Sequence, residues 1–323
     1  MHEAILVTGG AGYVGSHAAW FLAQQGYKVV VLDQLVSAHF PHHFAEYVCG
    51  DYGEKALIKG LCDRYRFVGV MHFGASTVVN ESVTQPISYY HNNVAKTIVL
   101  LDTLIASNIR FFIFSSSCAV YGLPERMPLT ENDPLLPISP YGTSKMMIEK
   151  ILADCDAAYG LRFIALRYFN AAGAQPRERL GEKHIPETHL IPLLLSAART
   201  GKPVSIFGTD YPTKDGTCIR DYVHVSDIAT AHYQALLHLK AGHPSDIFNI
   251  GTGIGFSVKE IITSVEHTTK TKLNITPTVR RIGDPAVLVA NPLKAMTLLR
   301  WKPIVSDLTT MVNSAWHFYQ THI

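Results

Sequence analysis

The chain has 323 residues, enough for one large domain or two ordinary ones, and 47% of them are hydrophobic while 17% are charged. Its 28 basic and 26 acidic residues leave a formal charge of +2, which gives no electrostatic basis for binding nucleic acid or a membrane surface. The five cysteines are scattered and form no Cys-x-x-Cys pair, so neither a disulfide framework nor a metal site is expected.

The N-terminal segment and the lengths of the apolar runs indicate the cellular compartment that we expect for the protein. The N-terminus lacks the basic segment of a signal peptide, and no apolar run approaches the ~18–20 residues of a membrane span. We therefore expect a protein of the reducing cytoplasm.

The first predicted element is a buried strand over 4–7, followed by a glycine-rich turn and a helix that stops at Gly26. The turn is Thr8-Gly-Gly-Ala-Gly-Tyr-Val-Gly15, with glycines at 9, 12 and 15. Such glycines permit a tight turn, close approach of the backbone to a diphosphate, and tight packing of helix on strand. The helix N-terminus would then face the phosphates with its partial positive charge. We expect a dinucleotide here.

Two acidic residues follow the next two strands. The buried run 29–32 ends at Asp33, where an acid is expected to meet the ribose 2′-hydroxyl of NAD and to repel the 2′-phosphate of NADP. A third strand over 47–49 precedes Asp51, which either accepts a hydrogen bond from the adenine amino group or caps the following helix.

Three further strands are predicted at 68–73, 110–114 and 163–167, with helices at 86–107 and 141–159 between them. Strands that alternate with helices in this way predict an α/β fold with a Rossmann-type, doubly wound parallel sheet. Small residues after the fourth strand would let the backbone approach a cofactor. The hydroxyls of Ser115 to Ser117 follow the fifth strand, at the sheet edge where such folds bind ligands.

The second half of the chain changes character. Short helices and strands predict a smaller mixed α/β substrate domain, so we place an NAD-binding domain at 1–170 and a substrate domain at 171–323. The segments near 222–252 are compatible with either domain. Arg220, Arg280 and Arg281 lie in this half, and guanidinium groups that converge on a cleft suit a diphosphate.

Tyr141 and Lys145 are four residues apart in Ser139-Pro-Tyr-Gly-Thr-Ser-Lys145. In a helix this spacing puts both side chains on one face. A nearby ammonium favours the phenolate, so we expect the pKa of Tyr141 to fall from ~10 toward neutrality and the phenol to serve as a general base.

Together these residues resemble the extended short-chain dehydrogenase/reductase family, and within it the UDP-sugar 4-epimerases. The resemblance runs nearly end to end and is carried by the glycine turn with Ser16 and His17, Phe114-Ser-Ser-Ser117, Val120-Tyr-Gly122, Ser139-Pro-Tyr-Gly-x-Ser-Lys145, Arg167-Tyr-Phe-Asn170, Ile206-Phe-Gly208, Arg220-Asp-Tyr-Val-His-Val225 and Gly283-Asp284. It implies a redox-neutral epimerization, UDP-glucose to UDP-galactose and back, through a 4-keto sugar with bound NAD. It also implies a homodimer that pairs through the helices near 92–107 and 141–158.

The resemblance also implies roles for individual residues. Tyr141 would take the proton of the sugar 4-hydroxyl, Ser117 would hold that hydroxyl, and Lys145 would bind the nicotinamide ribose. The other implied cofactor contacts are Gly9, Gly12, Tyr13, Val14, Gly15, Asp33, Asp51, Phe73, Gly74, Ala75, Asn92, Ser115 and Tyr168. The implied substrate contacts, besides Ser117 and Tyr141, are Phe169, Asn170, His189, Leu190, Phe207, Arg220, Arg281, Asp284 and Leu288.

Three departures from the family pattern bear on specificity. Thr77 stands where many epimerases have a lysine that reaches the cofactor, and His189 stands where an asparagine often contacts the substrate phosphates. Leu288 stands where a tyrosine often limits the pocket, which leaves UDP-N-acetylhexosamines open as substrates; UDP-pentoses are a further alternative. A non-catalytic dinucleotide-sensing protein on the same scaffold is the alternative from another class.

The positions after Ser117 help to separate related reactions. Related dehydratases and decarboxylases need an acid just after the active-site hydroxyl, and here Cys118 and Ala119 follow it. We therefore expect neither reaction, and we expect Cys118 to pack rather than to act as a nucleophile.

Overall fold

The larger part of the molecule is a parallel sheet of seven strands, which confirms the predicted fold class. A computed structural model describes residues 3–34, 42–281 and 283–323. The strand order is β10-β6-β5-β4-β1-β2-β3, and every pairing is parallel. The strands are β1 (Glu3–Thr8), β2 (Lys28–Asp33), β3 (Glu46–Cys49), β4 (Arg66–His72), β5 (Phe111–Ser117), β6 (Arg162–Tyr168) and β10 (Asp246–Ile250).

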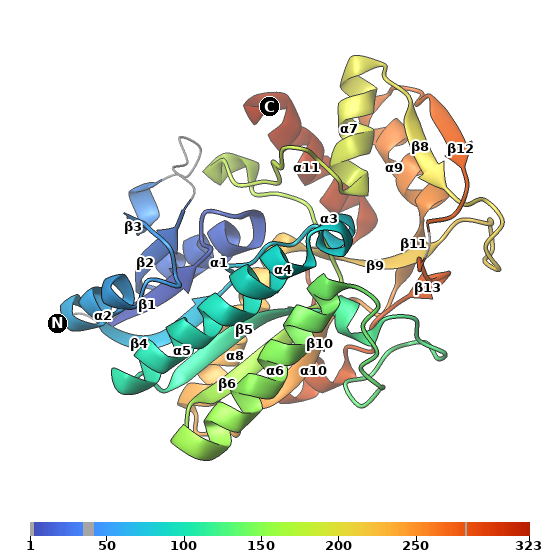
Figure 1. The fold of residues 1–323 in the computed structure, drawn as a ribbon. Coiled ribbons are helices and arrows are strands. Elements are labelled where there is room, and N and C mark those ends of the chain that lie inside the picture. Colours follow the sequence, from blue (N-terminus) through green and yellow to red (C-terminus); the bar gives the residue numbers. More distant parts are fainter. Residues whose placement is uncertain (1–2, 35–41, 282) are drawn as a thin grey trace.

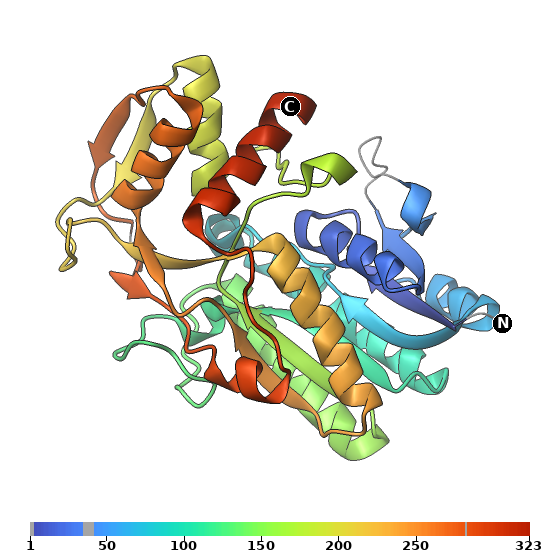
Figure 2. The ribbon, with the colours of Figure 1, turned by 180° about the vertical axis from the view of Figure 1, so that it is seen from behind.

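Helices cover both faces of this sheet (Figures 1 and 2). One face carries α1 (Tyr13–Gln24) and α8 (Val225–Lys240), and the other carries α2 (Lys55–Arg64), α5 (Lys96–Ala106) and α6 (Pro140–Tyr159). Side chains of β1 alternate between the two layers: Ile5 and Val7 belong to the core under α1 and α8, while Ala4 and Leu6 belong to the opposite core. This alternation is the period of a strand that is buried on both faces.

The predicted helix 86–107 is continuous but not uniform. It consists of α4 (Pro86–Tyr89), a π-helical turn (Tyr90–Ala95) and α5, and it follows the short helix α3 (Val79–Thr84), which the sequence did not predict. The wider π turn carries Asn92 and Asn93. The amide of Asn93 bonds both to the backbone of Ser76 and to Ser144 on α6, so the turn joins the segment after β4 to α6.

A smaller part sits at the carboxyl ends of the strands. It contains α7 (Leu190–Thr200), α9 (Val258–Thr269) and α11 (Leu308–His322), and β8 (Val204–Phe207) pairs with β12 (Ile275–Thr278). A second small sheet is built from β7 (Asn170–Ala172), β9 (Ile219–His224), β11 (Gly255–Ser257) and β13 (Val287–Leu288). These helices enclose a core of their own around Leu194, Ile261 and Met311.

The segment that the sequence left open is divided between the two parts. β9 joins the small sheet, whereas α8 packs on α1 and β10 forms the edge of the large sheet beside β6. The chain then leaves through α10 (Leu293–Leu298), which packs beside β10, and ends in α11. Among the described residues, none of the helices combines the length and the apolar content that a bilayer crossing requires.

Candidate active site

One cavity of about 1570 Å³ is lined by both parts of the molecule. It begins at the glycine turn, passes the carboxyl ends of β2, β4 and β5, and continues between α7, β8 and β9. Every residue predicted for catalysis, cofactor or substrate lines it, with the exception of Asp51. Residues from distant parts of the sequence are thus brought to one site.

The glycine turn leaves no room for side chains. Gly9 has a φ of +70°, and a Cβ there would lie 2.4 Å from the backbone nitrogen of Gly74. A Cβ on Gly15 would lie 2.4 Å from the carbonyl oxygen of Gly9. Backbone therefore packs directly on backbone, and the first turn of α1 begins at Tyr13 with its amide groups toward the cavity.

The two acids after β2 and β3 have different surroundings. Asp33 lines the cavity and accepts a hydrogen bond from the backbone nitrogen of Ala11 at 2.9 Å, so it also holds the glycine turn. Asp51 accepts bonds from Lys96 Nζ at 2.5 Å and from Gly53 N at 2.8 Å. The helix-cap interpretation of Asp51 is wrong, because α2 begins at Lys55 with Glu54 in the cap position.

Tyr141 and Lys145 lie in the first two turns of α6, which begins after a Ser139 cap whose hydroxyl accepts from Gly142 N. Lys145 Nζ donates to the carbonyl oxygen of Ser115 at 2.8 Å and lies 5.8 Å from the centre of the Tyr141 ring. The Ser117 hydroxyl lies close enough to the Tyr141 phenol to act on its pKa. The spacing thus predicted correctly that the pair shares one face of a helix and one cavity.

The expected fall in the pKa of Tyr141 is wrong for the chain's own groups. Burial raises the pKa of Tyr141 to about 12, and the Ser117 hydroxyl opposes this only in part. Burial also lowers the pKa of Lys145 to about 7, against the opposing charge of Glu149. The same desolvation acts on both groups and disfavours the charged form of each, so lysine supplies less positive charge than its ordinary pKa suggests.

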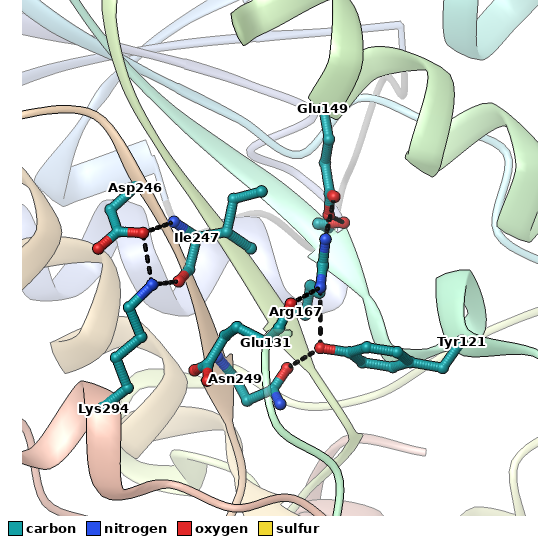
Figure 3. A network of polar contacts seen from close by, with 9 residues as sticks. Tyr121, Glu131, Glu149, Arg167, Asp246, Ile247, Asn249 and Lys294 are labelled. Carbon is teal, nitrogen blue, oxygen red and sulfur yellow. Dashed lines mark hydrogen bonds and ion pairs between the residues drawn. The ribbon is translucent and has the colours of Figure 1, made fainter. Parts of the chain in front are cut away.

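A buried polar network fixes the elements around this pair (Figure 3). Glu149, one turn beyond Lys145 on α6, accepts two bonds from the Arg167 guanidinium, at 2.9 and 2.5 Å, and one from Ser116 Oγ at 2.5 Å. Arg167 also donates to the Tyr121 hydroxyl at 2.8 Å, and Tyr121 donates to Asn249 on β10 at 2.7 Å. The network therefore ties α6 to β5, β6 and β10 beside the cavity.

The far end of the cavity is polar and cationic. Arg220 on β9 pairs with Asp284, and Leu288 on β13 lies opposite Arg220 in the small sheet. The Arg281 guanidinium lies 4.0 Å from the centre of the Phe207 ring. Arg280, the third arginine considered from the sequence, bonds to Asp210 and is not part of the lining.

The comparisons with known proteins agree with this geometry. Residues 5–251 match the model of the NAD dependent epimerase/dehydratase family. The chain belongs to this family. A UDP-glucose 4-epimerase of Halalkalibacterium halodurans is 46% identical over 321 residues, which cover 99% of this chain and 96% of that protein.

Two solved structures illustrate the range of related epimerases. The UDP-glucose 4-epimerase of Brucella ovis in complex with NAD is 45% identical, covers 98% of both chains and has a TM-score of 0.95. The UDP-Glc/GlcNAc 4-epimerase of Campylobacter jejuni is 37% identical, covers 99% of both chains and has a TM-score of 0.85.

The epimerase/dehydratase family includes two reaction outcomes, and the residues after Ser117 bear on them. Cys118 lies on the cavity, and burial raises the pKa of its thiol to about 12, so the thiol stays protonated near neutrality. Ala119 donates its backbone nitrogen to Ser117 Oγ at 3.2 Å. These two positions offer no carboxylic acid next to the Ser117 hydroxyl.

The sequence did not predict a group of acids and histidines beside the cavity, of which Glu182, His184 and His189 line it. Glu182, His184, Glu187 and His189 converge before α7, and of these only His189 was expected at the site. Hydrogen bonds that the His184 imidazole donates to Glu182 and Glu187 raise its pKa to about 10. The sequence signal is the spacing Glu-x-His-x-x-Glu-x-His between positions 182 and 189.

Proposed function

We propose that the protein interconverts UDP-glucose and UDP-galactose by reversible oxidation at C4 through a 4-keto sugar. The observation that carries this proposal is the Tyr141–Ser117 pair beside Lys145, on a cavity with no acid at positions 118 and 119. Such a site removes and returns one proton and offers no group for elimination. The full-length similarity to a UDP-glucose 4-epimerase supports the choice of sugar nucleotide.

The residues present fit NAD. The close packing of Gly9 and Gly15 forms a backbone cradle that side chains would fill, and Asp33 lies where a ribose hydroxyl, but not a phosphate, is accommodated. When bound, NAD supplies the acceptor for the hydrogen of C4 and gives it back. The wall beyond the glycine turn is made by Phe73, Gly74 and Ala75, with Asn92, Ser115 and Tyr168 completing the cofactor contacts.

Within this proposal the chain's own groups handle the proton. Tyr141 Oη takes the proton of the sugar 4-hydroxyl while Ser117 Oγ holds that hydroxyl in place, and the same phenol returns the proton in the second half of the cycle. Lys145 Nζ, held by the carbonyl of Ser115, binds the ribose next to the reacting atoms. The Glu149–Arg167 pair keeps α6 seated against β5 and β6, so the distances between these groups are fixed.

The second part of the molecule anchors the nucleotide. We assign residues 1–170 to NAD binding and residues 171–323 to UDP-sugar binding, with α8 and β10 completing the large sheet. Arg220 and Arg281 bind the diphosphate, and Phe207, Leu190 and Asp284 enclose the nucleoside. Phe169, Asn170 and Leu288 border the hexose, which must turn over between the two half-reactions while the anchored diphosphate stays in place.

A wider substrate range is the second candidate. Leu288 leaves more room than the tyrosine that often stands at this position, and a structural relative is a UDP-Glc/GlcNAc 4-epimerase. Activity on UDP-N-acetylhexosamines therefore belongs to the same proposal as a second substrate class.

We also propose a cytoplasmic homodimer. The helices α4, α5 and α6 adjoin one another on one side of the large sheet (Figure 1). Apolar side chains are exposed on them, with Ile98 on α5 48% exposed and Met147 on α6 40% exposed. A partner copy on this face would remove them from water. Light scattering of the purified protein tests it, and a monomer would contradict it.

The function is tested by initial rates with UDP-galactose, UDP-GalNAc and UDP-arabinose and by the variant Tyr141→Phe. We expect turnover of UDP-galactose in the wild type and a loss of at least ~10²-fold in the variant, with NAD still bound. Tyr159→Phe is the control, because Tyr159 ends the same helix and is 57% exposed. Failure with UDP-galactose, or full turnover by Tyr141→Phe, would contradict the proposal; a chain that binds NAD but turns over no sugar nucleotide would favour the sensing alternative.

A further inference from the structure

The segment between Gly181 and Leu190 holds four side chains of metal-binding type. One ligand atom from each of Glu182, His184, Glu187 and His189 lies within 4.8 Å of the other three. The segment lines the cavity between the glycine turn and the first turn of α7. Two imidazoles and two carboxylates are a donor set that proteins use for zinc.

The distances suit a tetrahedral ion. Nδ1 of His184 lies 3.2 Å from a Glu182 oxygen and 3.9 Å from a Glu187 oxygen, and Nδ1 of His189 contacts the same Glu182 oxygen. With bonds of about 2.0–2.2 Å to a central ion, neighbouring ligand atoms of a tetrahedral site are about 3.4 Å apart. Small side-chain rotations would therefore bring all four donors onto one ion.

The charge at this place also favours a cation. The carboxylates are the inner ligands, since the side chain of Glu182 is 7% exposed and that of Glu187 is 19% exposed, while His184 and His189 are 40% and 56% exposed. The negative charges of Glu182 and Glu187 also act on a neighbouring tyrosine: next to burial, they are the causes that raise the pKa of Tyr13. A divalent ion that enters from the imidazole side would displace the protons of His184 and His189, whose pKa values are raised, and would balance the two carboxylates in their place.

We propose that Glu182, His184, Glu187 and His189 bind one divalent transition-metal ion, with zinc as the best match, and that this ion holds the 181–190 segment in the conformation in which it borders the cavity. Two nitrogen ligands select zinc over magnesium or calcium, which prefer six or more oxygens. Four protein ligands leave no open position, which is the arrangement of a structural site. His189 would bind the metal through Nδ1, and its Nε2 would remain available for a ligand in the cavity.

The test is direct metal binding to the untagged full-length protein. The protein is treated with a chelator, desalted, and titrated with Zn²⁺ and, separately, with Mg²⁺ in competition with a chromophoric chelator. We expect one zinc per chain, and Glu187→Gln and His184→Ala should each weaken binding by at least about 100-fold, more than the loss of an outer-shell partner costs. Zinc at a hundred times its dissociation constant should raise the Tm of the wild type by about 3–6 °C.

A matched control is His43→Ala, since His43 pairs with Glu178 at 3.8 Å outside the cluster and its loss should leave zinc affinity unchanged. Glu187→Gln keeps the size and one oxygen of the side chain, so it decides the question alone if His184→Ala does not fold. Equal zinc affinity in wild type and variants, no zinc-dependent rise in Tm, or equal affinity for magnesium would overturn the proposal. The readouts need no sugar nucleotide, so they are independent of the epimerase assignment.

Discussion

The buried pair of Glu149 and Arg167 is expected to behave as one unit whose halves cannot be removed separately. Their side chains are 3% and 2% exposed, and the guanidinium contacts both carboxylate oxygens. Water therefore screens neither charge. We predict that Glu149→Gln, which keeps the shape of the side chain and an acceptor for Ser116, strongly lowers the free energy of unfolding.

The magnitude follows from what the change leaves behind. Arg167 would keep its charge but would have only neutral partners, namely the amide oxygen of the new glutamine, the Tyr121 hydroxyl and a backbone oxygen of Glu131. Removing one member of a buried ion pair costs about 3–5 kcal/mol because the other charge stays buried and uncompensated. Domains have a total stability of about 5–15 kcal/mol, so this is a large share. We expect a similar loss for Arg167→Met.

The double variant Glu149→Met with Arg167→Met, compared with its own single variants Glu149→Met and Arg167→Met, separates pairing from packing. It removes both charges and leaves mainly the Ser116 hydroxyl without its acceptor, which costs about 1–3 kcal/mol. The coupling energy of the cycle should therefore be several kcal/mol. Urea unfolding followed by circular dichroism, at one fixed NAD concentration because a bound ligand shifts stability, gives the four values.

A matched control lies one residue further along α6. Lys150 pairs with Asp154 at 2.9 Å, but their side chains are 75% and 66% exposed, so Asp154→Asn should change stability by less than about 1 kcal/mol. If the two buried single variants add up to the double variant within about 0.5 kcal/mol, the pair is not coupled and the reasoning is refuted. Where Glu149→Gln remains folded, turnover should fall by up to about 10²-fold, because Ser117 and Lys145 lose their fixed spacing.

Three further predictions concern the cavity and the core. Leu288→Tyr should reduce the rate with UDP-GalNAc at least tenfold, which corresponds to about 1.4 kcal/mol of lost binding to the transition state, and should leave the rate with UDP-galactose nearly unchanged. Equal losses of rate with both sugars would show that position 288 does not border the substituent at C2 of the sugar. Asp33→Asn should weaken NAD binding by about 10–100-fold and improve NADP relative to NAD, measured as cofactor retention on gel filtration, because it removes a charge facing the ribose. Burial lowers the pKa of His72 to about 3 and of His232 to about 4, so the unfolded chain binds more protons than the folded chain between those values and about 6.5. The free energy of unfolding should therefore decrease as the pH is lowered through that window, by up to about 1.4 kcal/mol per pH unit for each histidine. His232→Leu should flatten this slope in urea titrations at pH 5 and 7, and an unchanged slope would exclude His232 as a source.

The large sheet was predictable because its strands are buried on both faces and appear as short apolar runs. The small sheet was not, and β9 shows why. This strand has the sequence Ile219-Arg-Asp-Tyr-Val-His224, and its Asp221 is fully buried. The carboxylate of Asp221 is satisfied by backbone nitrogens of Thr252, Gly253 and Ala290. Partners so distant in sequence cannot be found from the local pattern of polar and apolar residues.

The residues of the candidate site were likewise predictable where a local sequence pattern identifies them and not predictable where only the tertiary fold brings them together. Residues held by a local pattern, such as the glycine turn and the Tyr141–Lys145 spacing, were placed on the cavity directly from the sequence. The far end was placed only through resemblance, because Arg220, Phe207 and Asp284 come from separate elements of the small part. The histidine–glutamate cluster was missed although its spacing is short, since nothing in the sequence shows that four polar side chains of one loop turn toward a common point.

The prediction that failed most clearly is the lowered pKa of Tyr141, which was inferred from its spacing to Lys145. The reason for this failure links the proposed base to the cofactor. Proximity to Lys145 predicted a lowered pKa, but the helix face that brings the two groups together also buries both. Burial leaves the phenol with a pKa of about 12 and the amine with a pKa of about 7, so the chain by itself holds a neutral acid beside a largely neutral amine at pH 8. Under the proposed function the positive charge that makes Tyr141 a base must then come mainly from the oxidised nicotinamide. Proton removal would thus be favoured only when the cofactor is ready to accept hydrogen, and would be reversed once it has done so.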